Sequence, residues 1–198
     1  MATPEIIATH PLVEEILELH RDRANGDEQG YAGYRGHVYR VLNLARALAE
    51  DCDDRDDKLA IAAAFHDLEA FSALDYLGPS IRSQDAWLER TGRQAWAPEL
   101  AVVVAEHHRL TRYRGGHARL AEAFRRADRA DVSQGLIRSG IPREYLRAVR
   151  ASFDVGAFFT RVVPQSVARN LLRHPLDPLP IVRARRALRQ AGHAGADD

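Results

Sequence analysis

The chain has 198 residues, of which 45% are hydrophobic and 28% charged, and its formal net charge is zero. This balance is typical of a globular domain with a buried core, and it excludes a peptide scaffold or a disordered tail. The single cysteine, Cys52, cannot form an internal disulfide or a cysteine-based zinc site. Because no signal peptide and no apolar stretch of roughly 20 residues is found, we expect a soluble, cytoplasmic protein without a membrane segment.

Charge is divided unequally between the two halves of the chain. Residues 1–100 carry 19 acidic against 10 basic side chains, and residues 101–198 carry 9 against 18. Two interpretations follow: an anion-binding region in the second half, or two halves that pack through complementary surfaces. Lys58 is the only lysine, and the excess of arginine and alanine is typical of a GC-rich coding bias. Arginine abundance alone is therefore weak evidence for phosphate binding.

Apolar residues recur at three- and four-residue spacing, and strand-like alternation is almost absent, so we predict an all-α fold with about eight to ten helices. In chain order, the predicted helices run from Pro11 to about residue 25 and then over residues 34–50, 56–71, 80–91, 98–110 and 118–133. Pro142 begins the next helix, Pro164 kinks or breaks a helix within residues 158–172, and residues 180–190 form the last one. A glycine-rich loop is expected at residues 26–36, with further loops at 75–80 and 111–117.

Four polar side chains interrupt the apolar faces of these helices. His37 extends the apolar stripe of its helix, and His66 and Asp67 interrupt the most hydrophobic helix of the chain. Asp128 lies four residues after Phe124, which directs it toward the same core. A buried carboxylate is costly without a partner, and a divalent ion would supply one. Histidine with carboxylate ligands favours Mn, Fe, Co, Ni or Zn over Mg, and water on such an ion becomes a nucleophile near neutral pH.

The segments GHVYRVLNLA, AAAFHDLEAF and RRADRADVS resemble the HD superfamily of helical, metal-dependent phosphohydrolases. The resemblance covers roughly residues 30–135 and implies a single-domain HD-type helical bundle with a metal-binding core in that range. Residues 1–29 would add an N-terminal helix packed on this core, and residues 136–192 would add C-terminal helices that complete the same domain.

The resemblance also implies a ligand set and a reaction. His37, His66, Asp67 and Asp128 match the four metal ligands, although the Ala-Asp pattern occurs twice and leaves Asp131 as an alternative to Asp128. One ion is expected and two are not excluded. The implied reaction is hydrolysis of a small phosphate ester or nucleotide by a metal-activated water, with Asp67 holding the ion and orienting that water.

Three further residues are candidates for catalysis. Glu69 lies two residues beyond Asp67. It could act as a general base or accept a hydrogen bond from a metal ligand, or it could be a solvated or salt-bridged glutamate at a helix end. His107 and His108 end an apolar helix. They could ligate a second metal, or protonate a leaving group and bind phosphate in their charged form. The alternative is that they lie at a helix end because its dipole favours cations there.

Arginines next to these residues are the predicted substrate ligands. Arg109 and Arg112 belong to a glycine-containing loop that could clamp phosphate oxygens, and Arg40 is a weaker candidate close to His37. A solvated loop in an arginine-rich protein is the alternative. The expected partner is a small anion, and no basic stripe with interleaved aromatic residues indicates nucleic acid.

Two other functions stay open at this point. The first keeps the fold and the metal but uses two irons, as in HD-type di-iron oxygenases, or performs a lyase reaction. The second is a non-catalytic helical module whose metal is structural. The oligomeric state is not predicted by the sequence.

Overall fold

The structure, a computed structural model, describes residues 4–23, 28–70, 76–156, 158–159 and 164. Within these ranges the chain forms seven α-helices, one 3-10 helix and no strand, which confirms the all-α prediction but falls slightly short of eight to ten helices. The helices are α1 (Pro11–Leu19), α2 (Glu28–Leu48), α3 (Arg55–Phe65), α4 (Leu77–Arg90), η1 (Gln94–Trp96), α5 (Ala97–Glu106), α6 (Ala118–Val132) and α7 (Arg143–Ser152). The helices predicted within residues 158–172 and at 180–190 lie almost wholly outside the described residues.

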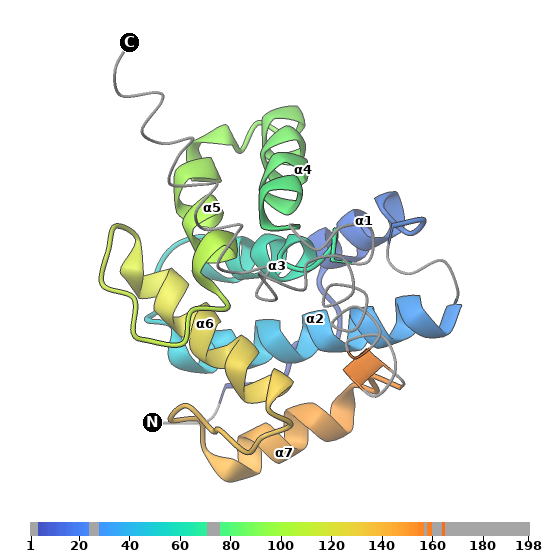
Figure 1. Cartoon of the computed structure of the whole chain (residues 1–198), viewed down its shortest axis with the longest axis vertical. Coiled ribbons are helices and arrows are strands. Elements are labelled where there is room, and N and C mark those ends of the chain that lie inside the picture. The colour runs from blue at the N-terminus through green and yellow to red at the C-terminus, as the bar shows by residue number, and fades with distance from the viewer. Residues whose placement is uncertain (1–3, 24–27, 71–75, 157, 160–163, 165–198) are drawn as a thin grey trace, which may run out of the picture.

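Helix α3 forms the centre of the molecule (Figure 1). Every residue from Leu59 to Phe65 is fully buried. Helices α1, α2, α4 and α5 pack around α3, α6 packs against both α2 and α5, and α7 packs against α2. One continuous apolar core extends from α1 to the residues that follow α7. None of the helices in the described ranges is long and apolar enough to cross a membrane.

The predicted glycine-rich loop at residues 26–36 is wrong, because α2 already begins at Glu28 and includes this glycine-rich segment. Gly33 and Gly36 lie where the backbone that follows α7 crosses α2. A Cβ atom on Gly33 would lie 2.8 Å from the carbonyl oxygen of Val155, and one on Gly36 would overlap the carbonyl oxygen of Asp154. These two glycines therefore allow close packing inside a helix and do not form a turn.

Other helix ends differ from the prediction by several residues. The helix predicted over residues 56–71 ends at Phe65, and it continues as tight turns in which Leu68 and Ala70 donate to carbonyls three residues earlier. The helix predicted from residue 80 begins at Leu77, since Pro79 is tolerated in a first helical turn. The helix predicted over residues 98–110 ends at Glu106. The pairs 66–67 and 107–108 therefore directly follow helix ends.

Candidate metal centre

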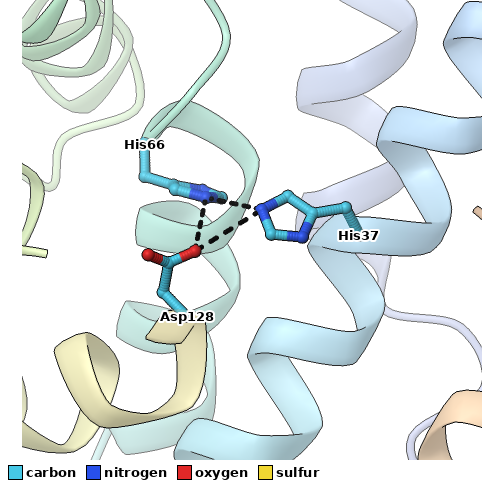
Figure 2. A group of neighbouring side chains, drawn as sticks. All are labelled: His37, His66 and Asp128. Atoms are coloured by element: carbon cyan, nitrogen blue, oxygen red, sulfur yellow. Dashed lines mark hydrogen bonds and ion pairs between the residues drawn. The ribbon is translucent and has the colours of Figure 1, made fainter. Parts of the chain in front are cut away.

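Three elements bring His37, His66 and Asp128 together in the core (Figure 2). His37 comes from the middle of α2, His66 directly follows α3, and Asp128 lies on α6. The Nε2 atoms of the two histidines are 3.1 Å apart, and they lie 3.7 and 3.9 Å from Oδ1 of Asp128. Oδ2 of Asp67 lies 3.9 Å from Nε2 of His37 and 3.5 Å from Nε2 of His66. An ion held at about 2.1 Å keeps neighbouring ligand atoms about 3.0–3.4 Å apart. The two histidine nitrogens already have this separation, and the carboxylate oxygens lie slightly farther away, at 3.5–3.9 Å.

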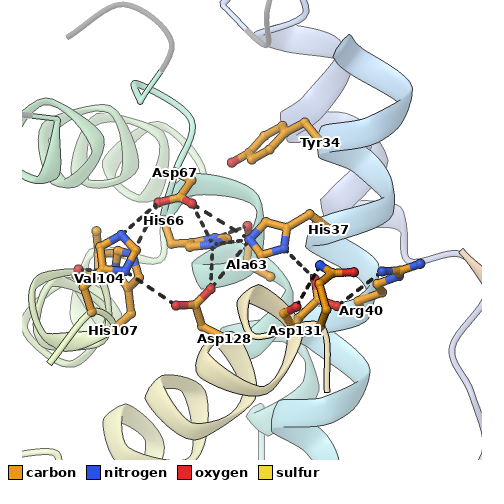
Figure 3. Close-up of polar contacts among 12 residues, drawn as sticks. Tyr34, His37, Arg40, Ala63, His66, Asp67, Val104, His107, Asp128 and Asp131 are labelled. Carbon is orange, nitrogen blue, oxygen red and sulfur yellow. Dashed lines mark hydrogen bonds and ion pairs between the residues drawn. The ribbon is translucent and has the colours of Figure 1, made fainter. Parts of the chain in front are cut away.

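His107 lies on the other side of the same carboxylates (Figure 3), and His108 belongs with it to a second group of candidate ligands. Oδ1 of Asp67 lies 3.3 Å from Nε2 of His107 and 3.7 Å from Nε2 of His108. Oδ2 of Asp128 lies 3.6 Å from Nδ1 of His108. Asp67 and Asp128 thus each have one carboxylate oxygen toward the pair His37 and His66, and the other oxygen toward the pair His107 and His108. Three overlapping sets of candidate ligands result: His37, His66 and Asp128; His66, Asp67 and His107; and His107, His108 and Asp128.

The outer hydrogen bonds of three histidines fix which ring nitrogen faces the cluster. Nδ1 of His66 and Nδ1 of His107 donate to the backbone carbonyl three residues earlier, at 2.8 and 2.7 Å. Nδ1 of His37 donates to Oδ2 of Asp131 at 2.8 Å. Because all three partners are acceptors, Nδ1 carries the proton in each ring and Nε2 presents a lone pair to the cluster.

Several of these inward atoms have no hydrogen-bond partner among the described residues. They are Oδ1 of Asp67, Oδ1 of Asp128 and Nε2 of His107. All three residues are less than 9% exposed, and an unsatisfied buried acceptor costs about 1–3 kcal/mol. A divalent cation on either side of the carboxylates would satisfy the acceptors that face it. The residues present therefore fit a metal ion.

Burial and mutual charge shift the pKa values of the cluster in opposite directions. Burial lowers the pKa of His66 to about 3 and raises the pKa of Asp128 to about 6. Burial alone would raise the pKa of Asp67, but the neighbouring histidines outweigh it and hold this pKa well below its usual range. Burial by itself would lower the pKa of His107, but the nearby carboxylates of Asp67 and Asp128 outweigh it and raise this pKa above its usual value. Without a cation, protons take its place beside the carboxylates.

The structure places Asp128 in the candidate ligand sets and Asp131 behind His37. Asp131 is fully buried, and its second oxygen, Oδ1, pairs with the guanidinium of Arg40 at 3.5 Å. That guanidinium also donates to the backbone carbonyls of Arg150 and Phe153. Figure 3 shows Arg40 on the far side of Asp131 from the other cluster residues. Substrate binding by Arg40 stays a prediction, and its contacts in this structure are with the protein itself.

Glu69 lies outside the three ligand sets. Its Oε1 atom accepts hydrogen bonds from Arg23 at 2.7 Å and from Ser83 at 3.0 Å. The tight turns after α3 direct this carboxylate toward α4, while Asp67 faces the cluster. Its catalytic role stays a prediction.

The predicted arginine clamp is divided between two places. Arg109 pairs with Glu106 at 3.2 Å and lies over the ring of Tyr113. Arg112 lines a groove of about 240 Å³ together with Leu48, at the C-terminal end of α2. His37 lies eleven residues before Leu48, or about 16 Å along the helix. The groove is therefore remote from the candidate metal centre, and phosphate binding by these arginines remains untested.

Two groups of aromatic residues at the site lie outside the predicted ligands and catalytic residues. The hydroxyl of Tyr76 forms a short hydrogen bond with Nε2 of His108. The rings of Phe158 and Phe159 lie against His37, with centroids 5.2 and 5.5 Å from the imidazole centroid. No sequence signal distinguishes these aromatic residues from core residues, because the contacts join distant parts of the chain.

Comparison with known proteins gives no assignment. No protein-family model matches the chain, and no curated protein or solved structure is significantly similar to it. The geometry of the cluster therefore carries the functional argument.

Proposed function

We propose that this protein is a metal-dependent phosphohydrolase of HD type, acting on a small phosphate ester or nucleotide. The observation that carries the proposal is the convergence of inward lone pairs from His37, His66, Asp67 and Asp128 in the buried core. The resemblance of the surrounding segments to the HD superfamily supports phosphate ester hydrolysis as the reaction. A bound divalent ion would supply an acidified water and polarise a phosphoryl oxygen.

The protein's own residues provide the ligands and the approach to the site. His37 and His66 have fully buried side chains and hold the inner end of the cluster. The side chain of His108 is 22% exposed and lies beside Tyr76 at the outer end. Substrate would enter past His108, since the other cluster residues are covered. Asp67, at 12% side-chain exposure, is placed to hold the ion and to orient the attacking water.

The two-sided arrangement of the carboxylates supports two ions in place of the one expected. His37 and His66 would hold one ion and His107 and His108 the other, with Asp67 and Asp128 as the carboxylate ligands. Double replacement of His107 and His108 by glutamine should lower the metal content from two ions to one. Metal analysis of the purified protein measures this directly.

The same observation favours a second candidate, a di-iron oxygenase or lyase. Both carboxylates face both histidine pairs, as a coupled pair of irons would require. Two irons per chain with a coupled pair in Mössbauer spectra, and no phosphatase activity in the iron-loaded protein, would favour this function.

The test of the first proposal is hydrolysis by protein stripped with a chelator and reloaded with Mn, Fe, Co, Ni or Zn. Substrates are p-nitrophenyl phosphate, its diester and nucleoside monophosphates. We expect activity that needs metal and falls at least 100-fold in His66→Ala and Asp128→Asn.

A matched control for that experiment removes a histidine outside the cluster. His117→Asn suits this purpose, because His117 is exposed and has a left-handed backbone that asparagine tolerates. This variant should hydrolyse the substrates as the wild type does. Background activity of the wild type at full occupancy with every metal would instead support the non-catalytic module.

A further inference from the structure

His37, His66 and His107 differ in the group that accepts a hydrogen bond from Nδ1, the ring nitrogen that faces away from the cluster. His66 and His107 follow the ends of α3 and α5, where the last helical carbonyls lack intrahelical donors and can accept from Nδ1. His37 lies inside α2, where the helix uses its own carbonyls. Its Nδ1 therefore needs an acceptor from another element. Asp131 on α6 is that acceptor, at 2.8 Å.

Helices α2 and α6 face each other through two pairs of residues with the same spacing. His37 and Arg40 are three residues apart on α2, and Asp128 and Asp131 are three residues apart on α6, so each pair lies on one helix face. The imidazole of His37 lies between the two carboxylates. Its Nε2 is 3.7 Å from Asp128, and its Nδ1 donates to Asp131.

Arg40 is fixed by the chain that leaves α7. Its guanidinium donates to the carbonyl of Phe153 at 2.7 and 3.0 Å and to the carbonyl of Arg150 at 2.9 Å. The side chain is only 7% exposed, and its remaining terminal nitrogen pairs with Asp131. Both oxygens of Asp131 are thus engaged, one by Arg40 and one by His37. The carboxylate cannot rotate toward the cluster without losing both contacts.

We infer that Asp131 is a positioning residue of the candidate metal centre, which holds His37 with Nε2 toward the ion and is itself held by Arg40. This inference rests on the proposed metal centre. A carboxylate that accepts the outer N–H of a ligand histidine fixes the ring and its tautomer and makes the ligand more basic. The two Ala-Asp pairs of the sequence then have different roles: Asp128 faces the ion, and Asp131 supports His37.

The test compares Zn²⁺ affinities of chelator-stripped, full-length variants by competition with a chromophoric chelator. Asp131→Asn keeps the volume of the side chain but removes its charge, and its Zn²⁺ dissociation constant should rise about 10- to 100-fold. Glu122→Gln is the matched control, because Glu122 also lies on α6 and pairs with a mostly buried arginine, Arg125, outside the ligand sets. The control should bind Zn²⁺ within about twofold of the wild type. Equal affinity of Asp131→Asn and the wild type would overturn the inference.

A second measurement needs no variant. In ¹H–¹⁵N spectra of the zinc-loaded wild type, His37 should carry its proton on Nδ1, and coordination through Nδ1 would overturn the inference even if Asp131→Asn fails to fold. Wild-type protein that binds no Zn²⁺ would overturn the metal centre and this inference together. Metal binding without hydrolysis of any phosphate ester would contradict only the proposed function.

Discussion

At the scale of single residues, the outer end of the cluster depends on Tyr76. Its hydroxyl bonds to His108, the most exposed of the cluster side chains. Burial raises the pKa of Tyr76 well above its usual range, and the nearby carboxylate of Asp67 raises it further. The phenol therefore keeps its proton near neutral pH. It is placed to donate a hydrogen bond to a phosphoryl oxygen that approaches past His108.

Tyr76→Phe should lower kcat/KM for a phosphate ester about 10- to 100-fold, because a hydrogen bond to a charged group contributes about 1.5–3 kcal/mol. The metal content should not change, since the hydroxyl belongs to none of the ligand sets. Steady-state kinetics and metal analysis measure the two quantities. Tyr145→Phe removes another buried hydroxyl, which donates to the backbone carbonyl of Asn43 on α2, and should leave kcat/KM unchanged. Full activity of Tyr76→Phe would exclude this role.

At the scale of elements, the position of His37 depends on how closely the chain after α7 approaches α2. Gly36 precedes His37 and leaves room for the backbone at residues 154–155. The same segment carries the Phe153 carbonyl that binds Arg40, and it leads to Phe158, whose ring stacks on His37. A helix interior normally disfavours glycine, so the residue type here serves tertiary packing.

Gly36→Ala should destabilise the protein by about 1–3 kcal/mol, although alanine is the better helix former by about 1 kcal/mol. The added methyl group would overlap the carbonyl oxygen of Asp154. Urea unfolding of the metal-free protein measures the effect. Gly116→Ala is the control, because a Cβ at Gly116 meets nothing within 4 Å, and its effect should stay within about 0.5 kcal/mol. An unchanged stability of Gly36→Ala would contradict the close packing.

At the scale of the whole molecule, the cluster joins the two oppositely charged halves of the chain. His37, His66 and Asp67 come from the acidic half, and the remaining cluster residues, which directly follow α5 or lie on α6, come from the basic half. One exposed ion pair, Glu50 with Arg119 at 2.9 Å, joins the halves in the sense of the charge division. The arginines near the cluster do not follow it: Arg40 of the first half pairs with Asp131 of the second, and Arg109 pairs with Glu106 within the second half.

Because its ligands lie on four separate segments, the ion should bind only the folded chain and raise its melting temperature. At a free metal concentration 100 times the dissociation constant, the gain is about 2.7 kcal/mol, or about 5–11 °C for a chain of this size. Thermal unfolding with Zn²⁺ and with a chelator measures the shift, which His66→Ala should reduce because His66 belongs to two of the three ligand sets. The shift should also shrink from pH 7.5 to pH 5.5, since burial raises the pKa of Asp128 to about 6 and protons then compete with the ion. An undiminished shift in His66→Ala would contradict the assigned ligands.

Local pattern predicted the helices well where apolar spacing was regular, and poorly where a residue type served tertiary packing. Residues 118–133 were predicted as a helix and form α6 almost to the residue, because their apolar face repeats every three to four residues. Residues 26–36 were predicted as a loop because glycine has a low helix propensity. In the structure glycine is needed at position 36 because the backbone at Asp154 leaves no room for a Cβ atom. The residue pattern within one segment cannot predict a contact with a segment so far away in the sequence.

The sequence by itself determined that the fold is helical and that His37, His66, Asp67 and Asp128 are polar groups in apolar surroundings. That conclusion needs only periodicity and the cost of burying charge. The tertiary structure alone decided that Asp128 faces the cluster while Asp131 supports His37, that His107 and His108 face the same carboxylates, and that Arg40 and Glu69 contact other protein groups. The physical reason is that each of these outcomes depends on contacts between elements that are far apart in the sequence: α2 with α6 and α7, and α3 with α5, around the cluster, and the residues after α1 and α3 with α4 around Glu69.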